Sequence, residues 1–122
     1  MATTDKLKEL KIEIKNSSEV LDKYSRDASL FKVKPQAVVF PKGIEDIKKL
    51  VRFAKESKLR GENISLTARS GGTDMTGGPL TESLVVDMTQ NFNRIKEVGS
   101  DFVTVEPGVF YRDFDKATRA KS

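Results

Sequence analysis

The residues whose types and spacing favour binding chemistry lie in one stretch, residues 66–80, with the sequence LTARSGGTDMTGGPL, and we call its glycine-rich part the glycine loop. Four of the chain's eight glycines fall between positions 71 and 78, directly after a strand-like run. Because glycine lacks Cβ, it reaches positive φ and lets backbone N–H groups approach a ligand closely. Successive N–H groups that point into one concavity form an anion nest. The loop is therefore either a phosphate-binding loop for a nucleotide or a surface turn.

Two familiar phosphate motifs do not match this loop. A Walker A loop needs Lys followed by Ser or Thr after its second glycine, whereas Gly77 is followed by Gly78 and Pro79. The dinucleotide fingerprint G-x-G-x-x-G is also absent. Residues 84–88, which come next, are strand-like, so we expect no helix N-terminus to offer its dipole to the loop.

Charged side chains near the loop favour a phosphate held mainly by backbone donors. Between residues 61 and 93 the only basic residue is Arg69, which either pairs with phosphate or ends its strand facing solvent or an acid. Asp74 is expected to accept from loop N–H groups in an Asx-type turn. Asp87 either meets a backbone or hydroxyl donor or marks a strand end at the surface.

Composition excludes several classes of site. The 122 residues are 33% charged and 37% apolar, which suits one globular domain or part of one. The absence of cysteine and histidine excludes disulfides, iron–sulfur ligation, thiol catalysis, a Ser-His-Asp triad and ordinary zinc sites from this segment. No apolar run reaches the ~20 residues of a membrane span, and no signal-peptide pattern begins the chain. We expect a cytoplasmic protein and find no candidate general base.

The net charge of +4 is unevenly distributed along the chain. Residues 1–60 hold 15 basic and 9 acidic residues. This half is either an electrostatic footprint for nucleic acid or a set of solvated helix faces. The acids interleaved with the lysines, and the lack of interspersed aromatic residues, favour the solvated faces.

The N-terminal part of the chain predicts short elements that lead into a buried strand. Residues 4–14 fit a weak helix, although residues 11–14 also alternate like a short strand. Residues 16–19 (NSSE) resemble a capped helix start, and residues 25–34 are irregular. Residues 36–40 contain an unbroken apolar run, AVVF, as expected of a strand buried on both faces.

The middle of the chain predicts a parallel strand–helix–strand unit. A helix is expected over residues 44–58, with Gly61 as its stop. Its apolar face is expected to consist of Ile44, Ile47, Leu50, Val51 and Ala54. A strand over residues 64–69 delivers the chain into the glycine loop. Residues 84–88 supply a third strand, and the order implies a right-handed crossover.

The C-terminal part of the chain predicts a hairpin and a helix. Residues 94–98 and 102–106 are joined by a three-residue turn that contains glycine. Pro107 and Gly108 end the hairpin, and Phe110, Phe114 and Ala117 mark the helix. The chain then stops without further core, which we interpret as a fragment boundary.

The order of these motifs resembles FAD-linked oxidases of the vanillyl-alcohol oxidase/PCMH type. The resemblance includes YSRDASLF (24–31), PQAVVFP (35–41), RSGGT (69–73) followed by the second glycine pair, NRI (93–95) and VTVEPGV (103–109). It is closest to the D-lactate/glycolate dehydrogenase branch. The resemblance implies an α/β first lobe, with a small parallel βαβ sheet, over residues 35–92. Residues 93–122 would begin a truncated antiparallel second lobe, and residues 1–34 would form a helical or irregular extension.

The same resemblance implies FAD as cofactor of a parent oxidoreductase that acts on a small 2-hydroxy acid. Its pyrophosphate loop would span residues 69–78. The implied cofactor-binding residues are Pro41, Arg69, Ser70, Gly71, Gly72, Thr73, Asp74, Met75, Gly77, Gly78, Pro107 and Gly108. Ser70 stands where many relatives have glycine, which argues against a positive φ there. Because the chain lacks the substrate-handling regions, we expect it to be inactive alone, to bind FAD weakly or not at all, and to self-associate. A stand-alone nucleotide-binding module and a basic nucleic-acid-binding domain are the alternatives.

Overall fold

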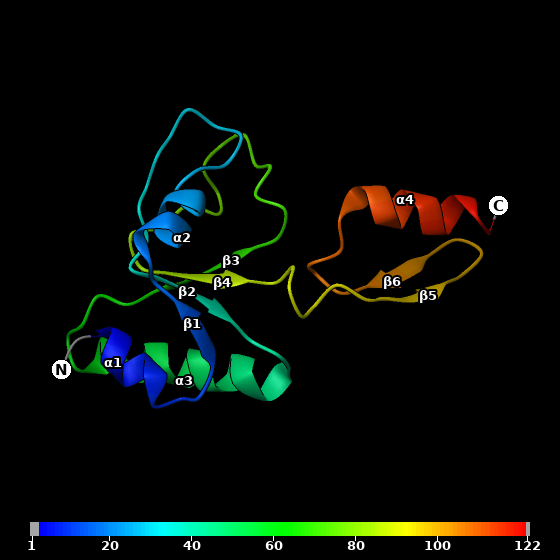
Figure 1. Ribbon diagram of the computed structural model, residues 1–122. Coiled ribbons are helices and arrows are strands. Elements are labelled where there is room, and N and C mark those ends of the chain that lie inside the picture. The colour runs from blue at the N-terminus through cyan, green and yellow to red at the C-terminus, as the bar shows by residue number, and fades with distance from the viewer. Residues whose placement is uncertain (1–2, 122) are drawn as a thin grey trace.

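The computed structural model describes residues 3–121 and contains a four-stranded sheet and a separate two-stranded ribbon (Figure 1). The sheet is formed by β1 (Glu13–Lys15), β2 (Ala37–Phe40), β3 (Leu66–Arg69) and β4 (Leu84–Asp87) in the order β1-β2-β4-β3. Strands β2, β4 and β3 run parallel, and β1 pairs antiparallel with β2. The expected α/β fold class with a parallel core is confirmed. The central position of β4, between the two strands that precede it in the chain, was not predicted.

Helices cover both faces of the central strands. Helices α1 (Thr3–Lys8) and α3 (Ile44–Leu59) pack on one face, and α2 (Ser18–Lys23) packs on the other (Figure 1). Every residue of β2 and β4 is therefore buried, which explains the apolar sequences of β2 and of residues 84–86 in β4. The main core consists of Leu7, Ile12, Ala37, Val39, Leu50, Phe53, Ile64, Leu84 and Val86.

The long helix α3 has the predicted bounds but not the whole predicted face. Gly61 adopts φ +81°, a left-handed conformation that suits the residue after a helix end. Leu50 is buried as expected, together with Phe53, which the sequence prediction omitted. Ile44 and Val51 are 69% and 56% exposed, so their placement on the packed face was wrong. The helix is rotated so that the stripe through residues 50, 53 and 57 meets the sheet.

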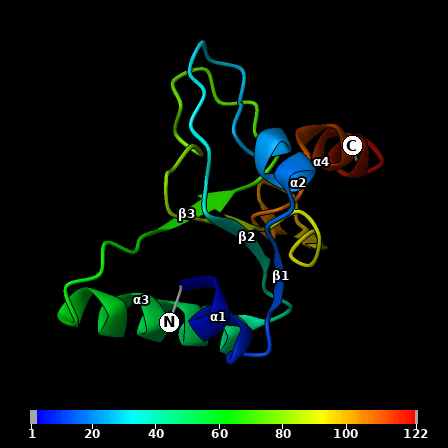
Figure 2. The ribbon, with the colours of Figure 1, turned by 60° about the vertical axis from the view of Figure 1, so that its left-hand side comes forward.

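The N-terminal region combines both alternatives predicted for it. Residues 4–14 contain α1 and then enter β1. Ser17 caps α2, and its Oγ accepts from the Val20 amide at 3.4 Å, as the NSSE pattern predicted. Residues 25–34 are irregular, apart from an isolated bridge between Arg26 and Lys32. This loop and the glycine loop extend together from the same side of the sheet (Figure 2).

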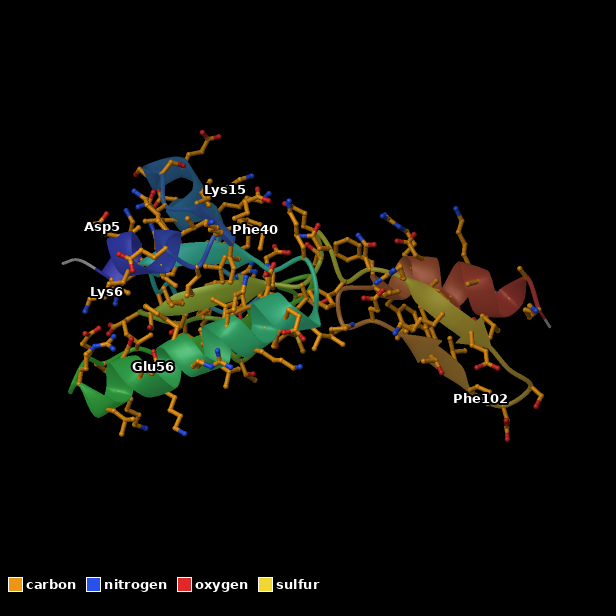
Figure 3. All side chains as sticks on the ribbon, turned by 90° about the horizontal axis from the view of Figure 1, so that it is seen from below. Asp5, Lys6, Lys15, Phe40, Glu56 and Phe102 are labelled. Carbon is orange, nitrogen blue, oxygen red and sulfur yellow. The ribbon has the colours of Figure 1, made fainter. Side chains whose placement is uncertain are left out.

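The predicted hairpin and final helix are present. Strands β5 (Ile95–Val98) and β6 (Val103–Val105) pair antiparallel, and α4 (Tyr111–Arg119) follows them. These elements lie beyond the end of β4, and Phe102 is exposed at their far tip (Figure 3). In the described residues 3–121, no helix has the length and apolar character required to cross a membrane.

Candidate functional site

The candidate site lies at one edge of the parallel strands. Because β2, β4 and β3 run parallel, their carboxyl ends meet there. Pro41 follows β2, residues 88–92 follow β4, and the glycine loop follows β3. Ligands of open parallel sheets bind outside the carboxyl ends of the strands. The fold therefore places the loop where such sheets hold ligands.

The backbone of the glycine loop presents unpaired donors. Among residues 3–121, no hydrogen bond uses the amides of residues 70–76, whereas the Gly77 amide donates to Asp27. Gly72 and Gly77 have φ values of +68° and +83°, which a residue with a side chain rarely adopts. Ser70 has no positive φ, so the serine causes no strain at that position. Sheet pairing thus leaves the donors of the loop available.

A concavity of about 450 Å³, which we call the loop–helix concavity, lies against these amides. Residues 70–74 line one side of it, and residues 109–112 line the other. The ring of Phe110 lies 3.3 Å from the point where a Cβ of residue 71 would stand. A side chain at position 71 would therefore have to displace the aromatic ring, so glycine permits this close approach.

The N-terminus of α4 forms the second wall of the loop–helix concavity. Phe110 is the N-cap of α4 and provides no side-chain hydrogen bond to the helix. The amides of Tyr111 and Arg112 make no hydrogen bond among the described residues. A helix N-terminus carries partial positive charge, and Arg112 adds a guanidinium to the lining. The expectation that no helix dipole is available was wrong, because the helix comes from a later segment of the chain rather than from the residues directly after the loop.

The Arg69 side chain meets backbone carbonyl oxygens rather than solvent or an acid. Its Nη1 donates to the carbonyl oxygen of Tyr24 at 3.3 Å, and its Nη2 donates to that of Arg26 at 2.7 Å. Its Cζ lies 5.2 Å from the centre of the Tyr24 ring. The guanidinium also fills the space beside Gly72, where an added Cβ would collide with it. Arg69 therefore connects the start of the glycine loop to the segment after α2.

A different aspartate performs the turn-fixing role predicted for Asp74. The Asp27 carboxylate accepts from the Gly77 amide at 3.0 Å and from the Ser29 amide at 2.8 Å. The backbone oxygen of Asp74 accepts from the Ala28 amide at 2.9 Å. Burial acts to raise the pKa of Asp27, but the hydrogen bonds from Ser29 and Gly77 outweigh it, and the pKa lies below its ordinary value. No simple local sequence pattern reveals the contact between Asp27 and Gly77, because the two residues lie far apart in the chain.

Asp87 meets donors, as one of the two sequence alternatives proposed. It is 4% exposed, and its Oδ2 accepts from the Tyr24 hydroxyl at 2.6 Å. Its Oδ1 accepts from the amides of Thr89 and Gln90 at 2.7 and 3.1 Å. Burial, followed by the hydrogen bond to Asp87, raises the pKa of Tyr24 above its ordinary value. Asp87 thereby fixes the turn at the end of β4.

The remaining predicted residues lie outside the loop–helix concavity. Pro41 is buried, and its carbonyl oxygen accepts from Asn91 Nδ2 at 3.1 Å. Gly108 packs on the backbone of residues 88 and 92, and its amide donates to the Phe92 carbonyl at 2.7 Å. Pro107 lies in a neighbouring groove with the start of α3. Met75 is 80% exposed on the loop, and Gly78 lies against the Asp74 carboxylate.

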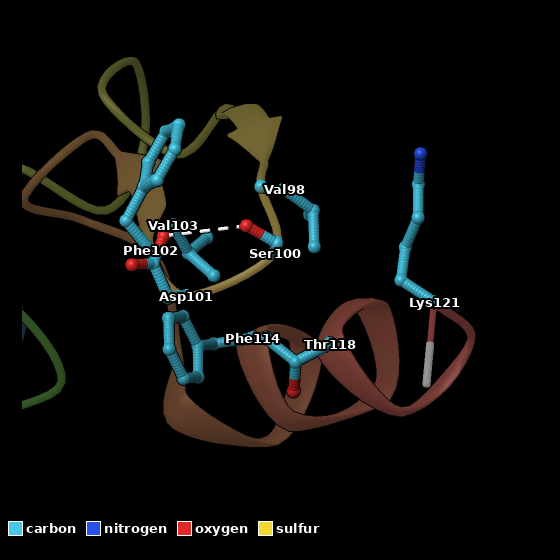
Figure 4. Close-up of a pocket in the computed structure, with 9 residues that line it drawn as sticks. Val98, Ser100, Asp101, Phe102, Val103, Phe114, Thr118 and Lys121 are labelled. Carbon is cyan, nitrogen blue, oxygen red and sulfur yellow. Dashed lines mark hydrogen bonds between the residues drawn. The ribbon is translucent and has the colours of Figure 1, made fainter.

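A second hollow lies within the C-terminal ribbon (Figure 4). Val98, Phe102, Val103 and Phe114 give it an apolar lining, and the Ser100 hydroxyl donates to Asp101 at 3.4 Å. Lys121 stands at its margin. The distance of 3.4 Å between Ser100 and Asp101 exceeds the roughly 2.6–3.2 Å at which a base activates a nucleophile, so we assign no chemistry to this hollow.

Comparison with known families matches most of the chain. The sequence model for the FAD binding domain matches residues 35–122. This chain belongs to the FAD binding domain family. D-2-hydroxyglutarate dehydrogenases from Escherichia coli K12 and Pantoea ananatis AJ13355 are 37% and 36% identical to it over 87 residues. Each match covers 70% of this chain and 8% of the relative, so the chain corresponds to a small part of those enzymes.

Solved structures confirm the fold expected from the resemblance. A 4-ethylphenol oxidase from Gulosibacter chungangensis superimposes with a TM-score of 0.77 at 24% identity, covering 97% of this chain and 24% of the oxidase. An alkyldihydroxyacetonephosphate synthase superimposes with a TM-score of 0.69 at 18% identity, covering 88% and 22%. The FAD domain described here thus has the PCMH-type fold, and its curated relatives are 2-hydroxy-acid dehydrogenases.

Proposed function

We propose that this chain is the N-terminal part of the FAD-binding domain of a flavin-dependent oxidoreductase, and that it holds the diphosphate of FAD. The observation that carries the proposal is that residues 70–74, whose amides are unpaired, line the loop–helix concavity together with the uncapped N-terminus of α4. Both walls present hydrogen-bond donors and partial positive charge, which suits a diphosphate. The residues present therefore fit the cofactor that the family implies.

Different residues have different roles in this proposal. The amides of Ser70, Gly71, Gly72, Thr73 and Asp74 bind phosphate oxygens. The first glycine pair lets the backbone of the loop approach the phosphates closely, and the second pair turns the chain back toward the sheet. Pro41, Met75, Pro107 and Gly108 border the cofactor outside the loop–helix concavity. No catalytic residue is assigned, and FAD, when bound, supplies the acceptor for the hydride that leaves the substrate carbon.

We further propose a two-lobed organisation, with residues 35–92 in the first lobe and residues 93–122 beginning the second. The N-terminal extension, residues 1–34, contributes β1 to the sheet and holds the glycine loop. The matched segment of the chain covers 8% of the length of its curated relatives. We therefore expect this chain alone to be inactive and to bind FAD weakly.

For the parent protein we propose oxidation of a small 2-hydroxy acid. The resemblance at the sequence level favours D-lactate or glycolate, and the names of the curated relatives add D-2-hydroxyglutarate. The test is reduction of an artificial electron acceptor by the full-length flavoprotein with each acid in turn. Turnover of one or more of the three supports the proposal, and turnover of none contradicts it.

The binding proposal is tested on the chain itself by ¹⁵N NMR. We expect FAD and ADP to shift the amide signals of Gly71, Gly72 and Thr73, and AMP to shift them less because it lacks the second phosphate. Duplex DNA at several salt concentrations tests the nucleic-acid alternative, which predicts salt-sensitive shifts across residues 1–60. Submicromolar ADP affinity in the isolated chain would favour a stand-alone nucleotide-binding module. Loop signals unmoved by millimolar ADP would reject the diphosphate site.

A further inference from the structure

The shape of the glycine loop is fixed at both ends by one short segment, residues 24–28. At the start of the loop, Arg69 donates to the carbonyl oxygens of Tyr24 and Arg26. At its far end, the Asp27 carboxylate accepts from the Gly77 amide. Between these, the Ala28 amide donates to the Asp74 oxygen. These contacts leave the amides of residues 70–76 unpaired.

The segment that holds the loop is itself held by the sheet. The Tyr24 hydroxyl donates to the buried Asp87 at the end of β4. The Tyr24 ring packs edge-on against Phe40, at the end of β2, with ring centres 6.3 Å apart. The guanidinium of Arg69, at the end of β3, lies against the same ring. Tyr24 therefore joins the carboxyl ends of all three parallel strands.

We propose that Arg69 is a positioning residue, which shapes the loop through residues 24–26 and does not contact the bound phosphates. Its guanidinium spans two carbonyl oxygens and supports the left-handed turn at Gly72. An ammonium group on a flexible stem cannot reproduce this planar, two-sided contact. The only arginine in the loop is thus used internally, and backbone donors bind the anion. This inference rests on the proposed diphosphate site.

The test compares Arg69→Lys with Arg69→Met in ADP titrations of the ¹⁵N-labelled chain. If Arg69 bound phosphate through its charge, Arg69→Lys would retain most of the ADP affinity. Arg69→Met would then lose affinity, and its ADP binding would depend less on salt. A positioning residue predicts that both variants weaken ADP binding by a similar factor, roughly tenfold, with the salt dependence unchanged. Lys32→Met is the charge control, since Lys32 is exposed and its side chain forms no hydrogen bond or ion pair within residues 3–121. Its ADP affinity should equal that of the wild type.

A third variant tests the other end of the loop, and it keeps the inference testable if the Arg69 variants fail to fold. Asp27→Asn retains one carbonyl oxygen where the carboxylate accepts with two. We expect weaker ADP binding from a chain whose far-ultraviolet circular dichroism is unchanged.

The outcomes separate this inference from the proposed function. Wild-type loop signals that ignore ADP reject the diphosphate site itself. If the wild type binds ADP, affinity retained in Arg69→Lys but lost in Arg69→Met overturns the positioning role, as does wild-type affinity in Asp27→Asn. Parallel losses in both arginine variants and in Asp27→Asn support it.

Discussion

The four-stranded sheet and the C-terminal ribbon, β5 and β6 with the α4 helix that follows them, differ in how much of their structure is buried. Strands β2 and β4 are completely buried between helices, whereas β5, β6 and α4 contain no buried residue. The ribbon has only two strands, and an isolated two-stranded unit is marginal in water. The candidate site lies between the glycine loop, which is attached to the buried sheet, and the N-terminus of α4, which belongs to the less buried unit. The loop can therefore be preformed while the opposing helix N-terminus depends on further support.

The sharpest test of this contrast is truncation of one large apolar side chain in each region. Leu84 in β4 is completely buried, and Leu84→Ala should lower the free energy of unfolding by about 2–5 kcal/mol. Phe102 at the ribbon tip is 51% exposed, and Phe102→Ala should cost less than about 1 kcal/mol. Urea denaturation measures both. Equal losses would show that the ribbon is as well packed as the sheet.

The junction between the two regions is tested at Gly108. An added Cβ would collide with the backbone oxygens of Met88 and Phe92, which cannot move as a side chain can. We expect Gly108→Ala to destabilise the protein by about 3 kcal/mol and to separate the ribbon from the sheet. Gly99→Ala is the matched control, because its Cβ meets only the exposed ring of Phe102. Similar melting temperatures for the two variants would contradict this assignment.

The preformed state of the loop is tested by a second pair of glycines. Gly72→Ala forces a side chain into positive φ and against the Arg69 guanidinium, so we expect roughly tenfold weaker ADP binding. Gly43→Ala is the control, since no atom lies within 4 Å of its added Cβ and its φ of −169° suits any residue. Calorimetric titration with ADP compares them. Wild-type affinity in Gly72→Ala would show that the loop adapts to its ligand.

The exposed ribbon also predicts association between copies of the chain. Phe102 and Val105 are exposed large apolar residues on this unit, and both outer strand edges lack a partner among the described residues. We expect concentration-dependent dimers in sedimentation equilibrium, and a several-fold weaker dimer for Phe102→Lys. Val51→Lys on α3 is the control, with unchanged association. A monomer at high concentration in the wild type would refute the prediction.

The smallest expected difference concerns acid stability. The hydrogen bond from Arg94 lowers the pKa of Glu106 below its ordinary value, and hydrogen bonds from Lys6 and Arg60 do the same for Glu62. A lowered carboxyl pKa adds stability above the ordinary value of about 4.3, and that stability disappears as the pH falls through the folded pKa.

In Glu106→Gln and in Glu62→Gln, the free energy of unfolding should decrease less than in the wild type as the pH falls below about 4.5. Amide exchange separates the regions: the ribbon should respond to the first variant, and the segments around Lys6 and Glu62 to the second. Identical exchange patterns in the two variants would contradict the assignment of each carboxylate's contribution to its own region.

Sequence was sufficient wherever the determining interactions are local. The helix ending at Gly61, the cap at Ser17 and the hairpin follow from neighbouring residues. The free loop amides also follow from local glycine chemistry. The pairing of β1 with β2, the insertion of β4 and the contact of Asp27 with Gly77 depend on residues far apart in the chain. Periodicity carries no signal for such contacts.

The contacts of Arg69 show why a residue type alone does not predict its partners. An arginine beside a phosphate loop invites assignment as an anion ligand, and the sequence offers no other basic residue nearby. Its carbonyl partners, Tyr24 and Arg26, come from a segment that precedes both β2 and α3 in the chain. The helix N-terminus opposite the loop was missed for the same reason, because α4 reaches the site through the fold.

The place of β4 between β2 and β3 has a consequence for synthesis on the ribosome. The strands β2 and β3 and the helix that joins them emerge first, yet the strands do not pair with each other in the native sheet. Residues 84–87 must enter between them, and parallel pairing across such distances is slow. Until β4 emerges, β2 and β3 each lack a partner on the edge that it will occupy, and the glycine loop is anchored to the full sheet only once β4 has been inserted.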